Sequence, residues 1–302
     1  MNVFVAGGSG TIGIPLVRAL VAANHQVTAL TRSMSKQGEL QALGASVAVA
    51  DALNREALIA AVAAAHPTHV IHQLTALPKD GPRRRRDLDA TNRLRIDGTR
   101  NLLEAAVQAG ARRFIVGSFA ILSARGPVAA ESDNDAAAAV RSMERQVLDA
   151  TERGSIEGVI LRYAMFYGLE TPSTVKMIDM VRKRRLPVVR GDAGQLPLIH
   201  VEDAVSATVR ALDLAPAGGT YDIVDDRAVS LTEIVETIAE YTGSAPPLRV
   251  PAWLPRLVAP YTARMTSIRM PLSNVKAKAE LGWQPQYSTM RDGFSQMFRS
   301  AA

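Results

Sequence analysis

The sequence predicts an α/β fold, with a doubly wound parallel sheet over residues 1–168 and a smaller C-terminal subdomain over 169–302. Three observations predict it. A short apolar run at 3–6 leads directly into the glycine-rich turn 7–13. Strand-like and helix-like runs then alternate as far as Gly168, which is typical of βαβ units. After Gly168 the pattern becomes less regular.

The alternating runs give the order of elements in the sheet-forming part. Apolar, β-branched runs predict strands, and runs of alanine, leucine and charged residues predict the connecting helices. The expected strands are 3–6, 27–30, 47–50, 70–74, 114–116 and 159–161. The expected helices are 14–23, 39–43, 55–65, 88–109 and 136–150. Helices should therefore cover both faces of the sheet, and ligands should bind at the carboxyl ends of its strands.

The C-terminal part has helix-like runs at 173–183, 202–214 and 231–241, with a strand-like run at 220–224. Prolines at positions 246, 247, 251 and 255 mark a connection to the last segment. A substrate-binding subdomain is expected in this part, although some of its pieces should return to the first sheet.

The composition is that of a globular chain and excludes several kinds of site. Hydrophobic residues make up 47% and charged residues 21% of the 302 residues. The absence of cysteine excludes disulfides and thiolate nucleophiles, and the five histidines lack metal-ligand spacing, so no metal is expected. No apolar run could span a bilayer and the first strand starts at once, so we expect a cytoplasmic protein with no membrane partner.

Two basic runs, at 83–86 and 182–185, contribute to a net charge of +6. The simplest interpretation is that they are solvated loops and helix ends. The alternative is that they attract an anionic cofactor or substrate. No aromatic residues are interleaved with them, so nucleic acid is not expected as a partner.

The glycine turn is the strongest functional signal. Gly7, Gly10 and Gly13 lack Cβ atoms, so the backbone can turn tightly and approach a pyrophosphate, which the N-terminus of the next helix attracts. Between a strand and a helix, the turn predicts a dinucleotide site that includes Thr11 and Ile12. The alternative is a purely structural turn.

The end of the second strand indicates which dinucleotide binds. An NAD site usually has an acidic residue there, but this strand ends in Thr31, Arg32 and Ser33. A guanidinium suits a 2′-phosphate, and Ser33 and Lys36 add a hydroxyl and a charge. We therefore expect NADP(H) to be preferred and NAD(H) to be possible. The alternative is that Arg32 is only a solvent-exposed residue.

Two further loops complete the predicted cofactor site. Asp51, next to Ala52, ends the third strand and could contact the adenine amino group, or it could instead cap the following helix. The residues Leu74, Thr75 and Ala76 follow the fourth strand and should line the cofactor by backbone contacts.

Five further segments give the chain its resemblance to a known family. They are 97–106 (DGTRNLLEAA), 113–118 (RFIVGS), 161–168 (LRYAMFYG), 199–203 (IHVED) and 281–285 (LGWQP). With the glycine turn, they make nearly the whole chain similar to the extended short-chain dehydrogenase/reductase (NAD-dependent epimerase/dehydratase-like) family. The resemblance implies a doubly wound Rossmann fold, a bound nicotinamide cofactor and a small C-terminal substrate domain.

Departures from the family pattern bear on the reaction. Members normally carry a Tyr-x-x-x-Lys pair on the helix expected at 136–150, and this helix has neither residue. The diphosphate-binding arginine of sugar-nucleotide members corresponds to Leu196, and a frequent asparagine corresponds to Met165. The chain thus resembles an atypical member with a less polar substrate, unless Arg190 substitutes. Arg95 stands where many relatives have asparagine, and the sequence gives it no role.

With the usual pair missing, Ser118 and Tyr167 are the candidate catalytic residues. Ser118 ends the fifth strand, where its hydroxyl could bond a substrate carbonyl beside the cofactor, or could simply be satisfied by backbone. Tyr163 and Tyr167 flank the expected nicotinamide position. We expect Tyr163 to pack beside the ring, and a structural role is the alternative for Tyr167.

Three functions fit these observations. The leading one is an NADPH-dependent oxidoreductase acting on a small, fairly apolar carbonyl, quinone or activated alkene, with a proton from water, Ser118, Tyr167 or the substrate. The second is a sensor or scaffold that binds NADP(H) without turnover, and the third is a sugar epimerase or dehydratase. The expected helices 88–109 and 136–150 could pair in a homodimer, as in many relatives.

Overall fold

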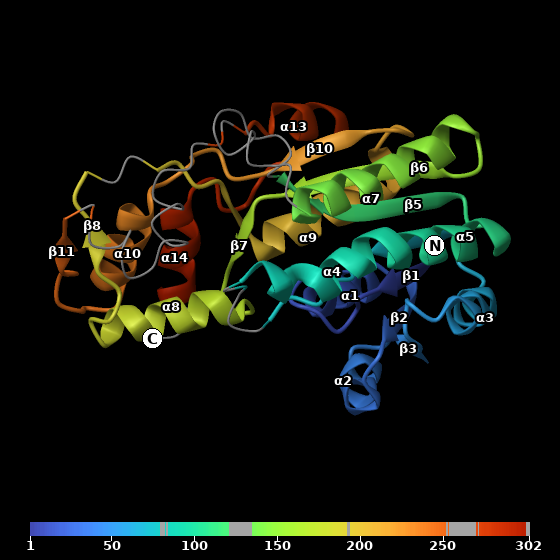
Figure 1. The fold of residues 1–302 in the computed structure, drawn as a ribbon, viewed down its shortest axis with the longest axis horizontal. Coiled ribbons are helices and arrows are strands. Elements are labelled where there is room, and N and C mark those ends of the chain that lie inside the picture. The colour runs from blue at the N-terminus through green and yellow to red at the C-terminus, as the bar shows by residue number, and fades with distance from the viewer. Residues whose placement is uncertain are drawn as a thin grey trace.

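A seven-stranded parallel sheet, in the order β3-β2-β1-β4-β5-β6-β10, forms the larger part of the molecule (Figure 1). The computed structural model describes residues 1–78, 82, 84–120, 135–191, 194–251, 253, 270 and 272–299. Arg83 and Pro255, which belong to the basic run and to the proline-rich connection, lie outside the described residues. The chain turns back between β3 and β4, so β1 and β4 are central neighbours, and the predicted doubly wound α/β fold is confirmed.

Each expected strand overlaps a strand of the sheet. These strands are β1 (Asn2–Ala6), β2 (Gln26–Thr31), β3 (Ser46–Val49), β4 (His69–His72), β5 (Arg113–Phe119), β6 (Glu157–Tyr163) and β10 (Thr220–Ile223). The helices that connect and cover them are α1 (Gly13–Ala22), α2 (Gln37–Ala42), α3 (Arg55–Ala65), α4 (Asp89–Arg93), α5 (Thr99–Gln108), α7 (Asp135–Glu152), α9 (Val201–Leu214) and α13 (Val275–Leu281). Short 3₁₀ turns lie at η1 (Met34–Lys36) and η2 (Arg85–Leu88).

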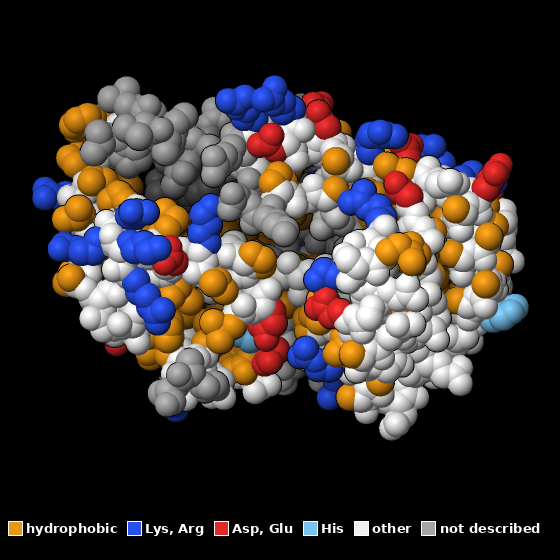
Figure 2. All heavy atoms as spheres, turned by 90° about the horizontal axis from the view of Figure 1, so that it is seen from below, with side chains coloured by type: hydrophobic (Ala, Val, Ile, Leu, Met, Phe, Trp, Pro, Cys, Tyr) orange, Lys and Arg blue, Asp and Glu red, His pale blue; other side chains and the backbone are white. Residues whose placement is uncertain are grey.

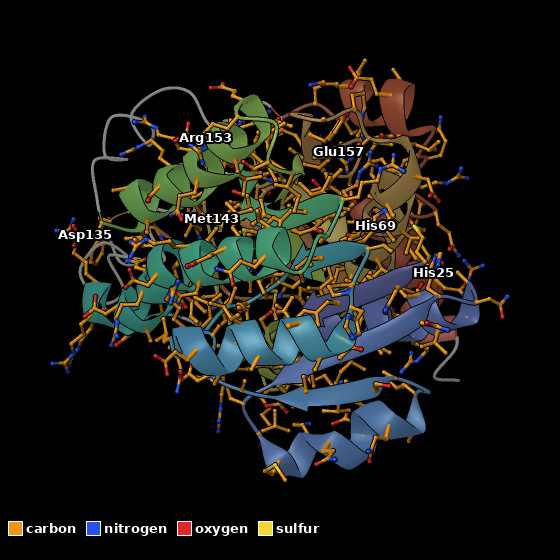
Figure 3. All side chains as sticks on the ribbon, turned by 90° about the vertical axis from the view of Figure 1, so that its right-hand side faces the viewer. His25, His69, Asp135, Met143, Arg153 and Glu157 are labelled. Atoms are coloured by element: carbon orange, nitrogen blue, oxygen red, sulfur yellow. The ribbon has the colours of Figure 1, made fainter. Side chains whose placement is uncertain are left out.

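The two faces of the sheet carry separate hydrophobic clusters. Because side chains alternate along a strand, Val3 and Val5 of β1 pack in the cluster of α1 and α9, whereas Phe4 and Ala6 pack in that of α3, α5 and α7. Figure 3 shows α3, α5 and α7 side by side over one face, with Met143 labelled on α7. Both faces are therefore covered, and the carboxyl edge of the sheet is the place left for a ligand.

The helical run between β4 and β5 differs from the sequence prediction. The expected single helix 88–109 contains a π-helical turn, η3 (Leu94–Gly98), between α4 and α5. Such turns insert an extra residue, re-aim the neighbouring side chains and are frequent at functional sites. Both α4 and η3 pack against α7.

The C-terminal part of the chain contributes both to the sheet and to a smaller body. β10 pairs with β6, and α9 packs against α1. The smaller body, at the left in Figure 1, contains β7 (Met165–Tyr167), β8 (Val188–Val189), β9 (Leu198–His200), β11 (Arg249–Val250), α8 (Pro172–Arg182), α10 (Leu231–Tyr241) and α14 (Met290–Arg299). It has its own apolar cluster, which includes Leu196 and Phe294.

The described surface carries both signs of charge. On the face drawn in Figure 2, Lys and Arg side chains are scattered, with Asp and Glu side chains among them. None of the helices in the described ranges combines the length and apolar composition that a bilayer span requires. In the same ranges, no three or more His, Asp or Glu side chains gather in a way that could hold a metal ion.

Candidate active site

The glycine turn leaves room for a ligand at the start of α1. Gly7 has a φ of +89°, and a Cβ there would lie 2.6 Å from the Gln73 carbonyl oxygen, so only glycine fits beside β4. A Cβ on Gly13 would overlap the Gly7 carbonyl oxygen. Gly10 and Thr11 are exposed, and Ile12 precedes α1 with no side chain capping the first turn. The Gly10 and Ile14 amides donate to the carbonyl oxygens of Gly7 and Gly10. The uncapped start of α1 between them can present N–H groups to phosphate oxygens.

The end of β2 lies against the glycine turn. Ser9 Oγ and Thr31 Oγ1 are 3.1 Å apart, which ties the two loops together. Arg32 and Ser33 are exposed at this edge. Arg32 has no ion-pair partner within the described part of the chain, while Lys36 is bound to Glu39 at 2.7 Å. The guanidinium of Arg32 is thus the cation that remains for a 2′-phosphate.

The third strand ends in a turn that Asp51 stabilises. Asp51 Oδ1 accepts a hydrogen bond of 2.9 Å from the Leu53 amide. The N-cap of α3 is Asn54 rather than Asp51, since Asn54 accepts from the Ala57 amide. Ala52 is buried, whereas Asp51 is exposed. The structure thus assigns Asp51 a local role and leaves its contact with an adenine as a prediction.

Two side chains fix the loop after β4 by accepting hydrogen bonds from its amides. The Leu74 amide donates to His72 Nδ1 at 3.1 Å, and the Ala76 amide donates to Thr91 Oγ1 at 3.0 Å. Thr75, between them, is exposed. With the Leu74 and Ala76 amides occupied, the carbonyl oxygens of the loop and the amide and side chain of Thr75 are the groups that could contact a cofactor.

Ser118 takes part in a buried charge network that the sequence analysis missed. Its hydroxyl donates to Glu144 Oε1 on α7 at 2.6 Å. Arg162 on β6 donates to both oxygens of the same carboxylate, at 2.9 and 2.6 Å. Both Ser118 and Glu144 are buried. Because its proton is directed to Glu144, Ser118 presents a lone pair rather than a proton to any substrate.

The side chain of Tyr163 is buried, and both hydrogen-bond partners of its hydroxyl are known. Its hydroxyl accepts from Gln73 at 2.9 Å and lies 2.7 Å from Thr208 Oγ1 on α9, which itself donates to the Ala204 carbonyl. Burial raises the pKa of the Tyr163 phenol to about 12. Arg162 faces α7, and residues alternate along a strand, so Tyr163 must face α9. The hydroxyl of Tyr163 is thus held inside the fold, and the expected packing of the residue beside the nicotinamide, through its backbone and ring face, stays a prediction.

Tyr167 is likewise enclosed, which argues against a catalytic role. It is 3% exposed and packs against His200 and Phe294, with ring centroids 5.0 and 5.7 Å away. Burial, with the neighbouring Asp225 carboxyl, raises the pKa of the phenol above its ordinary value. A phenol that is both covered by α14 and hard to ionise is a structural ring, the alternative that the sequence left open.

The described residues of α7 include neither tyrosine nor lysine. In its described length, Asp135–Glu152, the buried side chains apart from Glu144 are alanines, valines and Met143. Leu196 lies buried in the smaller body and pairs by backbone with Val229, so it cannot hold a phosphate. In the described part of the chain, neither α7 nor Leu196 thus provides the groups that the family pattern has at these positions.

Comparison with known proteins bears on the fold and the family. Residues 3–224 match the model of the NAD dependent epimerase/dehydratase family. The chain is 38% identical to the 3-diazoavenalumate denitrifying reductase of a Streptomyces species, over 97% of this chain and 99% of that protein. It is 28% identical to a 4-hydroxy-2-methyl-3-oxo-4-farnesyl-3,4-dihydroquinoline-1-oxide ketoreductase of Stigmatella aurantiaca, over 80% and 74% of the two chains.

A solved structure shares the same fold. The UDP-glucose 4-epimerase of Thermus thermophilus, in complex with NAD, superposes with a TM-score of 0.78 over the whole of both chains. Its sequence is 22% identical, so this likeness bears on the fold alone.

Proposed function

Because the chain belongs to the NAD dependent epimerase/dehydratase family, we propose that it is an NADP(H)-dependent reductase whose substrate accepts a hydride without taking a proton from the protein. The observation that carries this proposal is an open cofactor cradle beside an α7 face that has neither tyrosine nor lysine. When bound, the nicotinamide supplies the hydride, and the protein has to position the acceptor.

The cradle supports a phosphorylated dinucleotide. The uncapped first turn of α1 offers amides to the pyrophosphate, and the glycines let it approach. Arg32, exposed and without an acidic partner among the described residues, suits a 2′-phosphate better than a ribose hydroxyl. These features favour NADP(H) over NAD(H).

The surroundings disfavour substrates that need an acid. Hydride addition to a simple ketone leaves an alkoxide, which must gain a proton. Ser118 directs its proton to Glu144, and the Tyr167 phenol is enclosed. Quinones and enones are easier, since the anion that they form is delocalised and can take its proton from water.

An arenediazonium ion needs no proton at all. The hydride pair forms a new bond to the ring carbon, the carbon–nitrogen pair leaves with dinitrogen, and the products are the arene, N₂ and NADP⁺. The relative that is 38% identical is named as a denitrifying reductase of a diazo compound. We therefore place diazonium compounds first and quinones and enones second as substrates of this chain.

Deuterium transfer tests the proposal. The purified protein is incubated with NADPH deuterated at C4, in either configuration, and with 4-carboxybenzenediazonium, menadione, an enone or a ketone. We expect enzyme-dependent deuterium on carbon in the benzoate or in the reduced enone, from one configuration only. The hydroxyl hydrogens of a hydroquinone exchange with water, so reduction of menadione is followed instead by the loss of NADPH absorbance. Heat-inactivated protein controls for direct reaction with NADPH.

If NADPH binds and no acceptor is reduced above that control, the reductase proposal fails. Binding of NADP(H) without turnover would then be the better account.

A further inference from the structure

Arg95 is a cation in an enclosed position that the cofactor site does not use. It lies on the π-helical turn η3, and its only side-chain hydrogen bond within the described ranges is from Nη1 to Asn92 Oδ1, at 3.3 Å. Burial lowers the pKa of the guanidinium from its ordinary value. Shielding a guanidinium from water costs free energy of folding when no carboxylate lies beside it, and none of the described residues provides one for Arg95. Stability therefore does not explain an arginine at this position.

Two other shielded arginines, Arg113 and Arg162, form ion pairs with carboxylates. Arg113 binds Glu157 at 2.7 Å and also donates to two carbonyl oxygens at the end of α9. Arg162 binds Glu144. Within the described part of the chain, Arg95 has no carboxylate at ion-pair distance. It therefore retains the capacity to bind an anion that the described residues do not supply.

The neighbours of Arg95 locate it near the carboxyl edge of the sheet. Thr91, four residues earlier and so on the same side of the helical run, holds the loop after β4 through the Ala76 amide. The Arg95 charge also helps burial to lower the pKa of His72, at the end of β4, to about 4. On the other side, Gln146 of α7 donates to the Ile96 carbonyl at 3.2 Å. Arg95 thus lies between the loop predicted to line the cofactor and the helix that lacks the catalytic pair.

We propose that Arg95 binds a carboxylate of the substrate. This inference rests on the proposed function, because it assigns the second ligand of the same site. The dinucleotide's own anions are accounted for elsewhere, since its pyrophosphate belongs at the start of α1 and its 2′-phosphate at Arg32. The ribose next to the nicotinamide is neutral. An anion at Arg95 must then come from the substrate, and the planar guanidinium fits a planar carboxylate through two parallel hydrogen bonds.

The charge of Arg95 also sets which substrates are accepted. A cationic electrophile alone would be repelled by a half-buried guanidinium. The same electrophile with a carboxylate on its ring presents an anion to Arg95 while its reactive carbon faces the nicotinamide.

A matched pair of ligands tests the inference. Cinnamate and cinnamamide have nearly the same shape, and only cinnamate carries a charge. Each is titrated into the NADPH-loaded protein by calorimetry, with Arg95→Gln and Arg95→Lys as variants. Arg93→Gln is the control, because Arg93 is exposed on the same helical run. We expect Arg95→Gln to weaken cinnamate by about 10- to 100-fold and to leave cinnamamide unchanged, with Arg95→Lys in between.

Several outcomes would overturn the carboxylate site. They are equal binding of cinnamate and cinnamamide to the wild-type protein, no binding of either, or an equal loss in Arg95→Gln and Arg93→Gln. The wild-type comparison needs no variant, so it stands even where a variant fails to fold. Failure of NADPH itself to bind is a separate result, which would instead remove the proposed function.

Discussion

Replacing Asp225 by asparagine should change how the stability of the protein depends on pH. Asp225 follows β10 and is 4% exposed, and neither of its carboxylate oxygens has a well-formed hydrogen bond to another described residue. Burial, strengthened by the nearby Asp203 carboxylate, raises the pKa of Asp225 from 3.8 to about 8. Asparagine has the shape of the protonated acid and does not titrate, so Asp225→Asn removes this effect with little change in packing.

The sign and size follow from proton linkage. Between about pH 4 and pH 8 the folded protein holds a proton on Asp225 that the unfolded chain releases. The contribution of Asp225 to the free energy of unfolding is therefore largest at low pH and is lost as the pH rises towards 8. The loss is about 1.4 kcal/mol for each pH unit between pH 5 and pH 7. For a chain of this size, 1 kcal/mol corresponds to roughly 1.5 °C in Tm.

Thermal unfolding from pH 5 to pH 8 measures this effect. The Tm of Asp225→Asn minus that of the wild-type protein should increase by about 5 °C from pH 5 to pH 8. The Tm of Asp213→Asn, a substitution at an exposed position on α9, should follow that of the wild type over the same range. Parallel curves for Asp225→Asn and the wild type would refute the reasoning, because they would mean that Asp225 is already ionised in the folded protein.

Two further substitutions test the site. Glu144→Gln removes the buried carboxylate that accepts hydrogen bonds from Ser118 and Arg162 and should cost about 2–3 kcal/mol; unfolding in urea checks this, with exposed Glu152→Gln as the control, and equal midpoints for the two variants would contradict it. Gly13→Ala places a methyl group against the Gly7 carbonyl oxygen and should weaken NADPH by more than about 10-fold, whereas Gly38→Ala, with open space around it, should leave NADPH binding as it is. Unchanged fluorescence titrations for both would show that the turn does not hold the cofactor.

The regular parts of the fold could be predicted from local pattern. The helices Arg55–Ala65 and Leu231–Tyr241 begin and end where apolar periodicity and the caps Asn54 and Ser230 place them. The glycine turn could be predicted because its constraint is local, a strand and a helix meeting within a few residues. The π-helical turn at Leu94–Gly98 could not, since its extra residue leaves no mark in the apolar pattern.

The contacts of the site depended on pairings far apart in the chain. Ser118 and Glu144 are brought together by the rotation of α7 against β5. One signal was present in the sequence, because Glu144 lies four residues after Val140 and so on the buried stripe of an amphipathic helix, where an acid needs a partner. Tyr167 carried no such signal, since its burial is due to α14, more than a hundred residues later.

The proposed binding of NADP(H) depends on the glycine turn at the start of α1 and on Arg32. Titration of the wild-type protein with NADPH and NADH measures the affinity for each dinucleotide. Arg32→Ala is the test variant, and Arg153→Ala is the control, because Arg153 lies between the end of α7 and the amino end of β6 (Figure 3). We expect tighter saturable binding of NADPH than of NADH, and a loss of about 10- to 100-fold for NADPH alone in Arg32→Ala. Absence of saturable binding of either dinucleotide would contradict the account at its base.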